Sequence, residues 1–428
     1  MGLSQAQHDV FFYRTFVYLL APLMVLVQAF KGWRNPDYLK HWDERFGFCQ
    51  AKNPPYDLWI HAVSVGEVRA VVPLLQRLAK THDHIALTVT TPTGRKTAES
   101  LLSNLLEQKI DIYYLPYDMG FSVRRFLQAI KPKQAVVVET EVWPNLVVNC
   151  KRMGIPLTYI NVRLSERSFQ KYQKLQSFSQ QIFNTIDVIA AQGESDAKRL
   201  QKLGVDANKI QITGSLKFDL NMPASLKESA QSVRDLLANQ RTVWICGSTR
   251  DGEETQLLKV YKQLKSIHPD LLLVIVPRHL ERFDGVARLV ENSGLKLIRR
   301  TETPLSIAAE IDVYLGNTMG ELGLLYAASD IAFVGGSLVP FGGQNILEPC
   351  AVKVSVLFGP HMFNFEEISQ LVIEAKAGVC VQDSEQLAEK ISDLINHPNQ
   401  RDQMGCNGLE LIEQHKGALD KVERLLMS

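Results

Sequence analysis

The sequence predicts an α/β protein with two doubly wound domains that face each other across a cleft, preceded by an apolar N-terminal helix. At 428 residues the chain is too long for one ordinary hydrophobic core. Short apolar runs alternate with helical patterns along most of its length, which is typical of parallel sheets covered on both faces. The alternation pauses between residues 220 and 240 and then starts again, so we expect a domain boundary there.

Strands are expected where short apolar runs lie between turn signals. In the first half these runs cover residues 57–63, 84–90, 111–115, 134–140, 156–162 and 187–192. In the second half they cover residues 242–248, 271–277, 312–316, 330–336 and 354–359, and the chain after Pro398 looks helical. We therefore predict an anchor at 1–35 and two Rossmann-like domains at 36–220 and 221–428, with the last helix free to pack back on the first domain.

The N-terminal segment is the most apolar part of the chain. Residues 15–30 contain no charged side chain, but the run is shorter than the roughly 20 residues of a simple membrane span, and no signal-peptide cleavage site follows. Residues 31–52 carry five basic and three acidic side chains, together with Trp33 and Trp42. Basic and aromatic residues beside an apolar helix are typical of a membrane-surface anchor. We expect the helix to cross a membrane or lie on it; the alternative is a first helix packed into the core.

The composition argues against several classes of protein. A formal net charge of +1 is unlike that of a nucleic-acid binder. The six cysteines include no CxxC pair, so neither a disulfide framework nor a structural zinc site is expected, and a reducing compartment fits better. The chain has neither the GxGxxG fingerprint nor a Walker phosphate-binding loop, which counts against a dehydrogenase or a P-loop NTPase.

Unusual polar residues follow several predicted strands of the first half, at the sheet edge where α/β proteins bind ligands. Glu67, in HAVSVGEV, begins a helix and is either a general base or an ordinary carboxylate of a first helical turn. Glu139 and Glu141 end a fully apolar strand, and strand alternation would place both on one side. Such a pair serves acid–base chemistry or, equally, binds loop amides. Lys217, in GSLKFD, adds a cation at the same edge.

The second half contains a group of glycine-rich strand exits. They are GSTRDGEE (247–254), IVPRH (275–279), GNTMGEL (316–322) and FVGGSLVPFGGQNILEP (333–349). Glycine-rich turns before helices bind phosphate through their backbone amides. A carboxylate such as Glu348, three residues after Asn345, is suited to accept hydrogen bonds from ribose hydroxyls. These features predict a nucleotide site in the C-terminal domain.

Taken in order, HAVSVGE, ETEVWPN, NVRLSERS, GSLKFD, PRH, NTMGEL and FVGGSLVPFGGQNILEP closely resemble the motifs of the bacterial 3-deoxy-D-manno-octulosonic acid (Kdo) transferases. The resemblance covers nearly the whole chain. It implies a GT-B fold and an inverting transfer of Kdo from CMP-Kdo to the lipid A precursor, lipid IVA, in lipopolysaccharide core biosynthesis at the cytoplasmic face of the inner membrane. The N-terminal domain would bind the acceptor and the C-terminal domain the CMP-sugar.

The same motifs imply a set of site residues. Glu67 matches the family's catalytic base, and Glu139 and Lys217 match its proposed transition-state stabilisers. The predicted CMP-binding residues are Ser248, Pro277, Arg278, Met319, Gly320, Glu321, Asn345, Ile346, Leu347 and Glu348, with the ribose on Glu348.

The resemblance implies no cofactor besides the donor substrate. Helix-start amides near Gly320, with Arg278 or Lys217, would stabilise the departing CMP without a metal, and no DxD-type motif stands in a suitable place. Two positions depart from the family pattern: Gln344 stands where many members have histidine, and Asn317 where aspartate is frequent. Both keep hydrogen-bonding ability, so we expect unchanged chemistry without an ionisable group at either position.

Two other classes of function are alternatives to a Kdo transferase. One is a different sugar-nucleotide enzyme, either a GT-B transferase that uses a UDP-sugar or an epimerase. The other is a membrane-docked nucleotide- or glycolipid-binding protein without catalysis. The epimerase has no need of the anchor, and neither enzyme alternative explains HAVSVGE or ETEVWPN.

Overall fold

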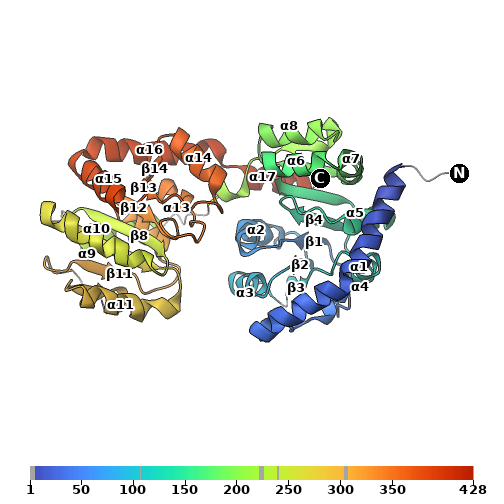
Figure 1. Ribbon diagram of the computed structural model, residues 1–428, viewed down its shortest axis with the longest axis horizontal. Coiled ribbons are helices and arrows are strands. Elements are labelled where there is room, and N and C mark those ends of the chain that lie inside the picture. Colours follow the sequence, from blue (N-terminus) through green and yellow to red (C-terminus); the bar gives the residue numbers. More distant parts are fainter. Residues whose placement is uncertain (1–4, 107, 221–225, 239–240, 303–306, 428) are drawn as a thin grey trace. The chain divides into compact units, whose positions relative to one another are not determined.

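The computed structural model describes residues 5–427, apart from residue 107 and residues 221–225, 239–240 and 303–306. Residues 1–4 of the predicted anchor and the first residues after the predicted domain boundary therefore lie outside the described residues. The chain forms two compact units, each a sheet between layers of helices (Figure 1). Unit 1 comprises Met1–Asp219 and Lys416–Ser428, and unit 2 comprises Leu220–His415.

Unit 1 is built on a seven-stranded parallel sheet. Its strands are β1 (Leu58–His61), β2 (Ile85–Val89), β3 (Ile110–Tyr114), β4 (Gln134–Val138), β5 (Leu157–Val162), β6 (Val188–Ala191) and β7 (Ile210–Ile212). They lie in the order β3-β2-β1-β4-β5-β6-β7. The chain starts in the middle, moves to one edge, then returns and continues to the other, so β1 and β4 are neighbours at the topological switch point.

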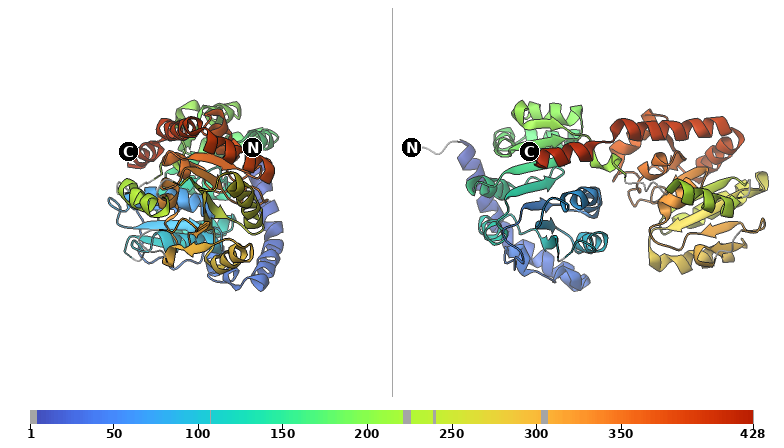
Figure 2. Two further views of the ribbon diagram at one scale, coloured as in Figure 1. Left: turned by 90° about the vertical axis from the view of Figure 1, so that its left-hand side faces the viewer. Right: turned by 180° about the vertical axis from the view of Figure 1, so that it is seen from behind.

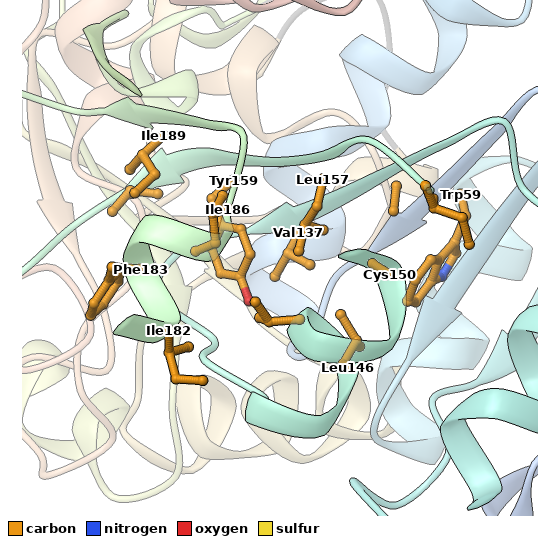
Figure 3. Close-up of a cluster of buried hydrophobic side chains, with 14 of the residues drawn as sticks. Trp59, Val137, Leu146, Cys150, Leu157, Tyr159, Ile182, Phe183, Ile186 and Ile189 are labelled. Carbon is orange, nitrogen blue, oxygen red and sulfur yellow. The ribbon is translucent and has the colours of Figure 1, made fainter. Parts of the chain in front are cut away.

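Helices cover both faces of this sheet. They are α1 (Gln5–Arg34), α2 (Val65–Leu78), α3 (Pro92–Leu101), α4 (Gly120–Ile130), α5 (Pro144–Arg152), α6 (Glu166–Gln173), α7 (Gln176–Thr185), α8 (Glu194–Lys202) and α17 (Ala418–Met427), with short 3-10 segments η1 (Pro36–Tyr38), η2 (Asp43–Phe46), η3 (Ala207–Lys209) and η4 (Leu216–Phe218). One core cluster joins α4, α5, α7 and α8 to the sheet around Trp59 and Tyr159 (Figure 3). The other joins α2, α3 and α17 to the opposite face.

Unit 2 repeats the plan with a second seven-stranded parallel sheet. Its strands are β8 (Val243–Thr249), β9 (Leu272–Pro277), β10 (Leu297–Arg299), β11 (Val313–Leu315), β12 (Ile331–Val334), β13 (Ser355–Phe358) and β14 (Gly378–Cys380). The order is β10-β11-β9-β8-β12-β13-β14, with the switch point between β8 and β12. The helical segments are α9 (Leu226–Ala238), α10 (Glu253–Ile267), η5 (Leu280–Arg282), α11 (Phe283–Asn292), η6 (Arg300–Glu302), α12 (Leu322–Ala327), α13 (Leu347–Ala351), α14 (Glu366–Glu374), α15 (Ser384–Asn396) and α16 (Pro398–His415).

The prediction of two doubly wound Rossmann-like domains is confirmed, because every predicted apolar run overlaps a strand. Three strands were not predicted: β7, β10 and β14. Each has only three residues and lies at an edge of its sheet, where burial is partial and a long apolar run is not needed.

The first helix packs lengthwise on unit 1 (Figure 2). On its inner side the Tyr13 hydroxyl donates a hydrogen bond to Asp118 at 2.8 Å, and the buried Gln28 donates one to the Tyr38 carbonyl at 2.7 Å. Its outer side exposes large apolar residues at helical spacing, namely Leu19, Leu23, Leu26, Val27, Phe30 and Trp33. We call these six residues the outer face of α1. Among the helices described, none has the length and apolar character needed to cross a membrane.

One of the basic residues expected to flank the anchor has a different environment. Arg45 is only 5% exposed; its guanidinium lies 4.2 Å from the centre of the Tyr114 ring and donates to the Thr90 carbonyl. The neighbouring Glu44 accepts hydrogen bonds from the Tyr114 amide and from Arg95. Arg45 therefore fastens η2 to the end of β3 and does not contribute a surface charge, which corrects the sequence interpretation of this residue.

The last helix belongs to unit 1 although unit 2 precedes it in the chain. The Asp219 carboxylate accepts hydrogen bonds from the amides of Gly417 and Leu419, both at 2.6 Å, at the start of α17. Leu419 and Val422 then join the core cluster that contains the apolar face of α2. Helix α17 thus supports the helix that begins beside Glu67.

We expect Leu419→Ala to destabilise unit 1 by about 2–5 kcal/mol, because it removes buried methyl groups from the α2–α17 contact. Native-state hydrogen exchange should show faster exchange of the β1 and β4 amides, with those of β8 and β12 unchanged. The exposed Lys421→Ala serves as the control on the same helix. Equal loss of protection in both sheets would contradict this division of the core.

Candidate active site

Glu67 lies at the switch point of unit 1, in the first turn of α2, the helix that follows β1. The Ser64 hydroxyl accepts a hydrogen bond from the Glu67 amide at 3.2 Å and caps α2. In return, the Glu67 carboxylate accepts hydrogen bonds from the Val63 amide at 2.7 Å and from the Ser64 hydroxyl at 3.0 Å. This reciprocal capping arrangement fixes the position of the carboxylate. Glu67 as a whole is only 6% exposed.

The environment of Glu67 makes it titratable near neutral pH. Burial raises the pKa of Glu67 to about 7, and the negative charges of Glu139 and Glu141 act in the same direction. The hydrogen bonds from Val63 and Ser64 oppose this shift and are too weak to cancel it. A carboxyl group with such a pKa is suited to accept a proton from a hydroxyl substrate.

Glu139 and Glu141 follow β4, which is paired with β1. Glu139 has a left-handed backbone with φ 61°, and its amide donates to the Ile160 carbonyl at 2.9 Å. The strand has therefore ended at Val138, so the predicted alternation of the two glutamates along an extended strand is wrong. A non-glycine residue in this conformation is uncommon and is often found at functional sites.

Lys217 is the cation of this group. Its Nζ lies 3.4 Å from Oε1 of Glu139. Burial and the charge of Glu139 raise the pKa of the neighbouring Glu141. The structure thus brings the three predicted catalytic residues Glu67, Glu139 and Lys217 to the same edge of the sheet in unit 1.

A residue that the sequence reasoning missed, Asn161, holds the segment with Lys217 in place. Asn161 is fully buried at the end of β5, with φ 55°. Its Oδ1 accepts a hydrogen bond from the Leu216 amide at 3.1 Å, and Gln192 donates to its carbonyl. The sequence signal was available in NVRLSERS, where an asparagine stands among apolar strand residues.

In unit 2 the predicted nucleotide-binding residues lie at the carboxyl edge of the sheet. Ser248 is a buried residue near the end of β8 with φ 56°, and the Arg278 amide, after Pro277 at the end of β9, donates to the Thr249 carbonyl at 3.1 Å. These two strands meet at this edge because they are hydrogen-bonded neighbours.

The loop before α12 contains Met319, Gly320 and Glu321. Met319 is exposed, and Gly320 has φ 85°, which favours glycine. Glu321 accepts two hydrogen bonds from Arg300, at 2.9 and 3.1 Å, and this ion pair lowers the pKa of Glu321. Arg300 was not predicted; it keeps this carboxylate ionised and fixes the loop.

Asn345 and Glu348 lie together around the start of α13. Asn345 Oδ1 accepts a hydrogen bond from the Leu347 amide at 3.1 Å, and its Nδ2 donates to Glu348 at 3.4 Å. Ile346 and Leu347 are fully buried, so they support the start of α13 from the core.

The glycine-rich turn after β12 differs from the prediction. The buried carboxylate of Glu253, at the start of α10, accepts hydrogen bonds from the amides of Gly336 at 2.7 Å, Ser337 at 3.1 Å and Leu338 at 3.1 Å. It also accepts one from the Arg250 amide at 3.2 Å. The expectation that the amides of this turn bind phosphate is therefore wrong, because an internal carboxylate already occupies them.

The described residues contain no group of three or more histidine, cysteine, aspartate or glutamate side chains arranged to hold a metal ion.

Comparison with known proteins agrees with this division of the chain. Residues 40–220 match the family model described as 3-deoxy-D-manno-octulosonic-acid transferase, and residues 249–410 match that of the glycosyl transferases group 1. A 3-deoxy-D-manno-octulosonic acid transferase of Haemophilus influenzae is 38% identical over 421 residues, which is 97% of each chain.

Solved structures show the fold. A glycosyltransferase from Rickettsia africae superposes with a TM-score of 0.54 at 15% identity, covering 88% of this chain and 100% of that one. UDP-GlcNAc 2-epimerase from Neisseria meningitidis superposes with a TM-score of 0.53 at 16% identity, covering 87% of this chain and 100% of that one. The predicted GT-B fold is thus confirmed, but transferases and epimerases share it, so the fold does not distinguish them. The extent and identity of the match to the Haemophilus protein do distinguish them. They show that the chain belongs to the 3-deoxy-D-manno-octulosonic acid transferase family.

Proposed function

We propose that this chain transfers Kdo from CMP-Kdo to the lipid A precursor, lipid IVA, with inversion at the anomeric carbon and without a metal ion. The observation that carries the proposal is the buried Glu67, whose pKa of about 7 arises beside the Glu139–Lys217 pair. The name of the Haemophilus relative supports Kdo as the transferred sugar. A UDP-sugar transferase or an epimerase shares the fold but not the family.

In the proposed reaction Glu67 takes the proton from an acceptor hydroxyl while that oxygen bonds to the anomeric carbon of Kdo. The bond between this carbon and the phosphate oxygen breaks, and CMP leaves with the electron pair. Lys217 offsets the charge of Glu139 and so limits how far Glu139 raises the pKa of Glu67. Arg278 is the predicted cation for the departing phosphate.

The reaction is tested with purified full-length protein, CMP-Kdo and tetraacylated lipid A precursor in the presence of EDTA. We expect CMP release and a lipid that gains one or more Kdo masses. Glu67→Gln should lower kcat by about 10²–10⁴-fold while CMP still binds, because only the proton acceptor is lost. The exposed Glu310→Gln is the control for loss of one carboxylate.

Three outcomes would contradict parts of the proposal. Full turnover by Glu67→Gln would exclude it as the base, and CMP release without a heavier lipid would mean a different acceptor. CMP binding by the wild-type protein without any turnover would favour the non-catalytic binding protein.

The pH dependence of kcat/KM should report the pKa of Glu67. Below about pH 7 Glu67 is protonated and cannot accept a proton, so activity should fall about tenfold per pH unit on the acidic side. Glu139→Gln removes a neighbouring negative charge, which lowers the pKa of Glu67 and moves this acidic limb to lower pH. An acidic limb that stays in place in Glu139→Gln would contradict the assignment; Glu310→Gln should leave it unchanged.

We further propose that the outer face of α1 lies on the cytoplasmic surface of the inner membrane. The inner side of α1 is already packed on unit 1, so its apolar outer face has the geometry of an interfacial helix, with Lys31 and Arg34 in its last turn. This favours a helix that lies on the bilayer over one that crosses it. A bilayer-bound acceptor would then be presented to the same unit that contains Glu67.

Leu23→Ser combined with Leu26→Ser should weaken binding to anionic phospholipid vesicles by about 100-fold or more, because two exposed leucines no longer enter the apolar phase. Co-sedimentation measures the affinity, and transfer to a detergent-solubilised acceptor should change little. Leu280→Ser removes a similarly exposed leucine from unit 2 and should leave vesicle binding intact. Unchanged binding by the double variant would disprove the role of α1.

A further inference from the structure

One of the glycine-rich turns at the carboxyl edge of the sheet in unit 2 is not available to an anion. Since Glu253 occupies the amides of residues 336–338, a doubly anionic donor such as CMP-Kdo needs positive side chains beside this turn. Arg250, Arg278 and Arg282 supply cations next to these turns. Arg282 is already paired with the buried Glu254, at 2.7 and 2.9 Å, so it is not available.

Arg250 is held in a defined orientation without a counter-ion. Its guanidinium lies 5.3 Å from the centre of the Phe341 ring, and one of its terminal nitrogens donates to Nε2 of His279. Among the described residues no carboxylate forms an ion pair with its side chain; the charge of Glu253 only opposes the lowering of the Arg250 pKa by burial and by Arg282, and the buried Nε has no hydrogen-bond partner. A partly buried cation without an ion-pair partner costs free energy, which the charge of an anion bound at the guanidinium would offset.

The surroundings of Arg250 are shaped for this placement. A Cβ at position 336 would lie 3.3 Å from Cγ of Arg250, so Gly336, with φ 69°, leaves room for the arginine stem. His279 accepts from the guanidinium and is therefore neutral: burial lowers the pKa of His279, and the charges of Arg250 and Arg278 lower it further. His279 thus orients the guanidinium without neutralising its charge.

The two anions of the donor can be assigned to different arginines. The motif resemblance gives the ribose to Glu348 and the departing phosphate to Arg278. Arg250, on the side of Phe341, is left for the second anion.

We propose that Arg250, oriented by Phe341 and His279, binds the carboxylate of the transferred sugar and so selects an acidic sugar donor. This inference rests on the proposed function, since it takes CMP-Kdo as the donor. The planar guanidinium fork, stacked on an aromatic ring, matches the planar geometry of a carboxylate.

The test measures binding of CMP, of a CMP-Kdo analogue with a methylene in place of the glycosidic oxygen, and of the same analogue with its carboxylate as a primary amide. Calorimetry on the full-length protein gives each affinity. The wild type should prefer the acid over the amide by roughly 10- to 100-fold. Arg250→Gln should lose this preference, with CMP affinity changed by less than about threefold.

Two further variants sharpen the comparison. Arg250→Lys keeps the charge but not the fork, so it should retain part of the preference, which a merely structural role of Arg250 would not predict. Arg288→Gln removes an exposed arginine from α11 and should retain all of it. Thermal melting of each variant establishes that it is folded.

Three results would overturn the inference: equal wild-type affinity for acid and amide, an intact preference in Arg250→Gln, or an equal loss of CMP affinity, which would place Arg250 on the phosphate. Transfer from CMP-Kdo by the wild type is measured separately. A wild type that prefers the acid but transfers no Kdo would refute the proposed function and leave the carboxylate site standing.

Discussion

The site in unit 1 depends on holding carboxylates close together where water is scarce. Burial and mutual repulsion both favour the protonated form of such groups, and Glu67 is the member on which these effects converge. The cation Lys217 contacts the group through Glu139. The rest of the local structure serves this balance: the capping serine fixes Glu67, the left-handed turn at Glu139 directs that residue, and Asn161 keeps Lys217 within reach.

Glu67 and Glu253 show how one sequence pattern gives two opposite results. Both are glutamates next to a glycine at the start of a helix, and both accept hydrogen bonds from backbone amides. The Glu67 carboxylate accepts one hydrogen bond from an amide and one from a hydroxyl, and it lies near other carboxylates, so it remains titratable. The Glu253 carboxylate accepts hydrogen bonds from four backbone amides, which saturate it as an acceptor. Its role is therefore structural: it holds the glycine-rich turn in place.

Most of the architecture followed from apolar runs and their alternation with helical patterns, because long buried strands require such runs. The three-residue edge strands β7, β10 and β14 were not predicted, because partial burial at a sheet edge does not require a long apolar run. The predicted site residues came from motifs, and the structure gathers them at the two sheet edges. Their environment did not follow from sequence: the bend at Glu139, the partner of Glu321 and the occupant of the glycine-rich turn all depend on residues distant in the chain.

The return of α17 has a consequence for synthesis. Unit 1 is interrupted in sequence by the whole of unit 2, so a nascent chain that has passed Asp219 still lacks the helix that covers α2. Unit 2 is contiguous and can complete its own core first. The apolar side of α2 therefore stays partly uncovered until α17 has been synthesised, and exposed apolar surface of this kind favours aggregation of an incomplete domain.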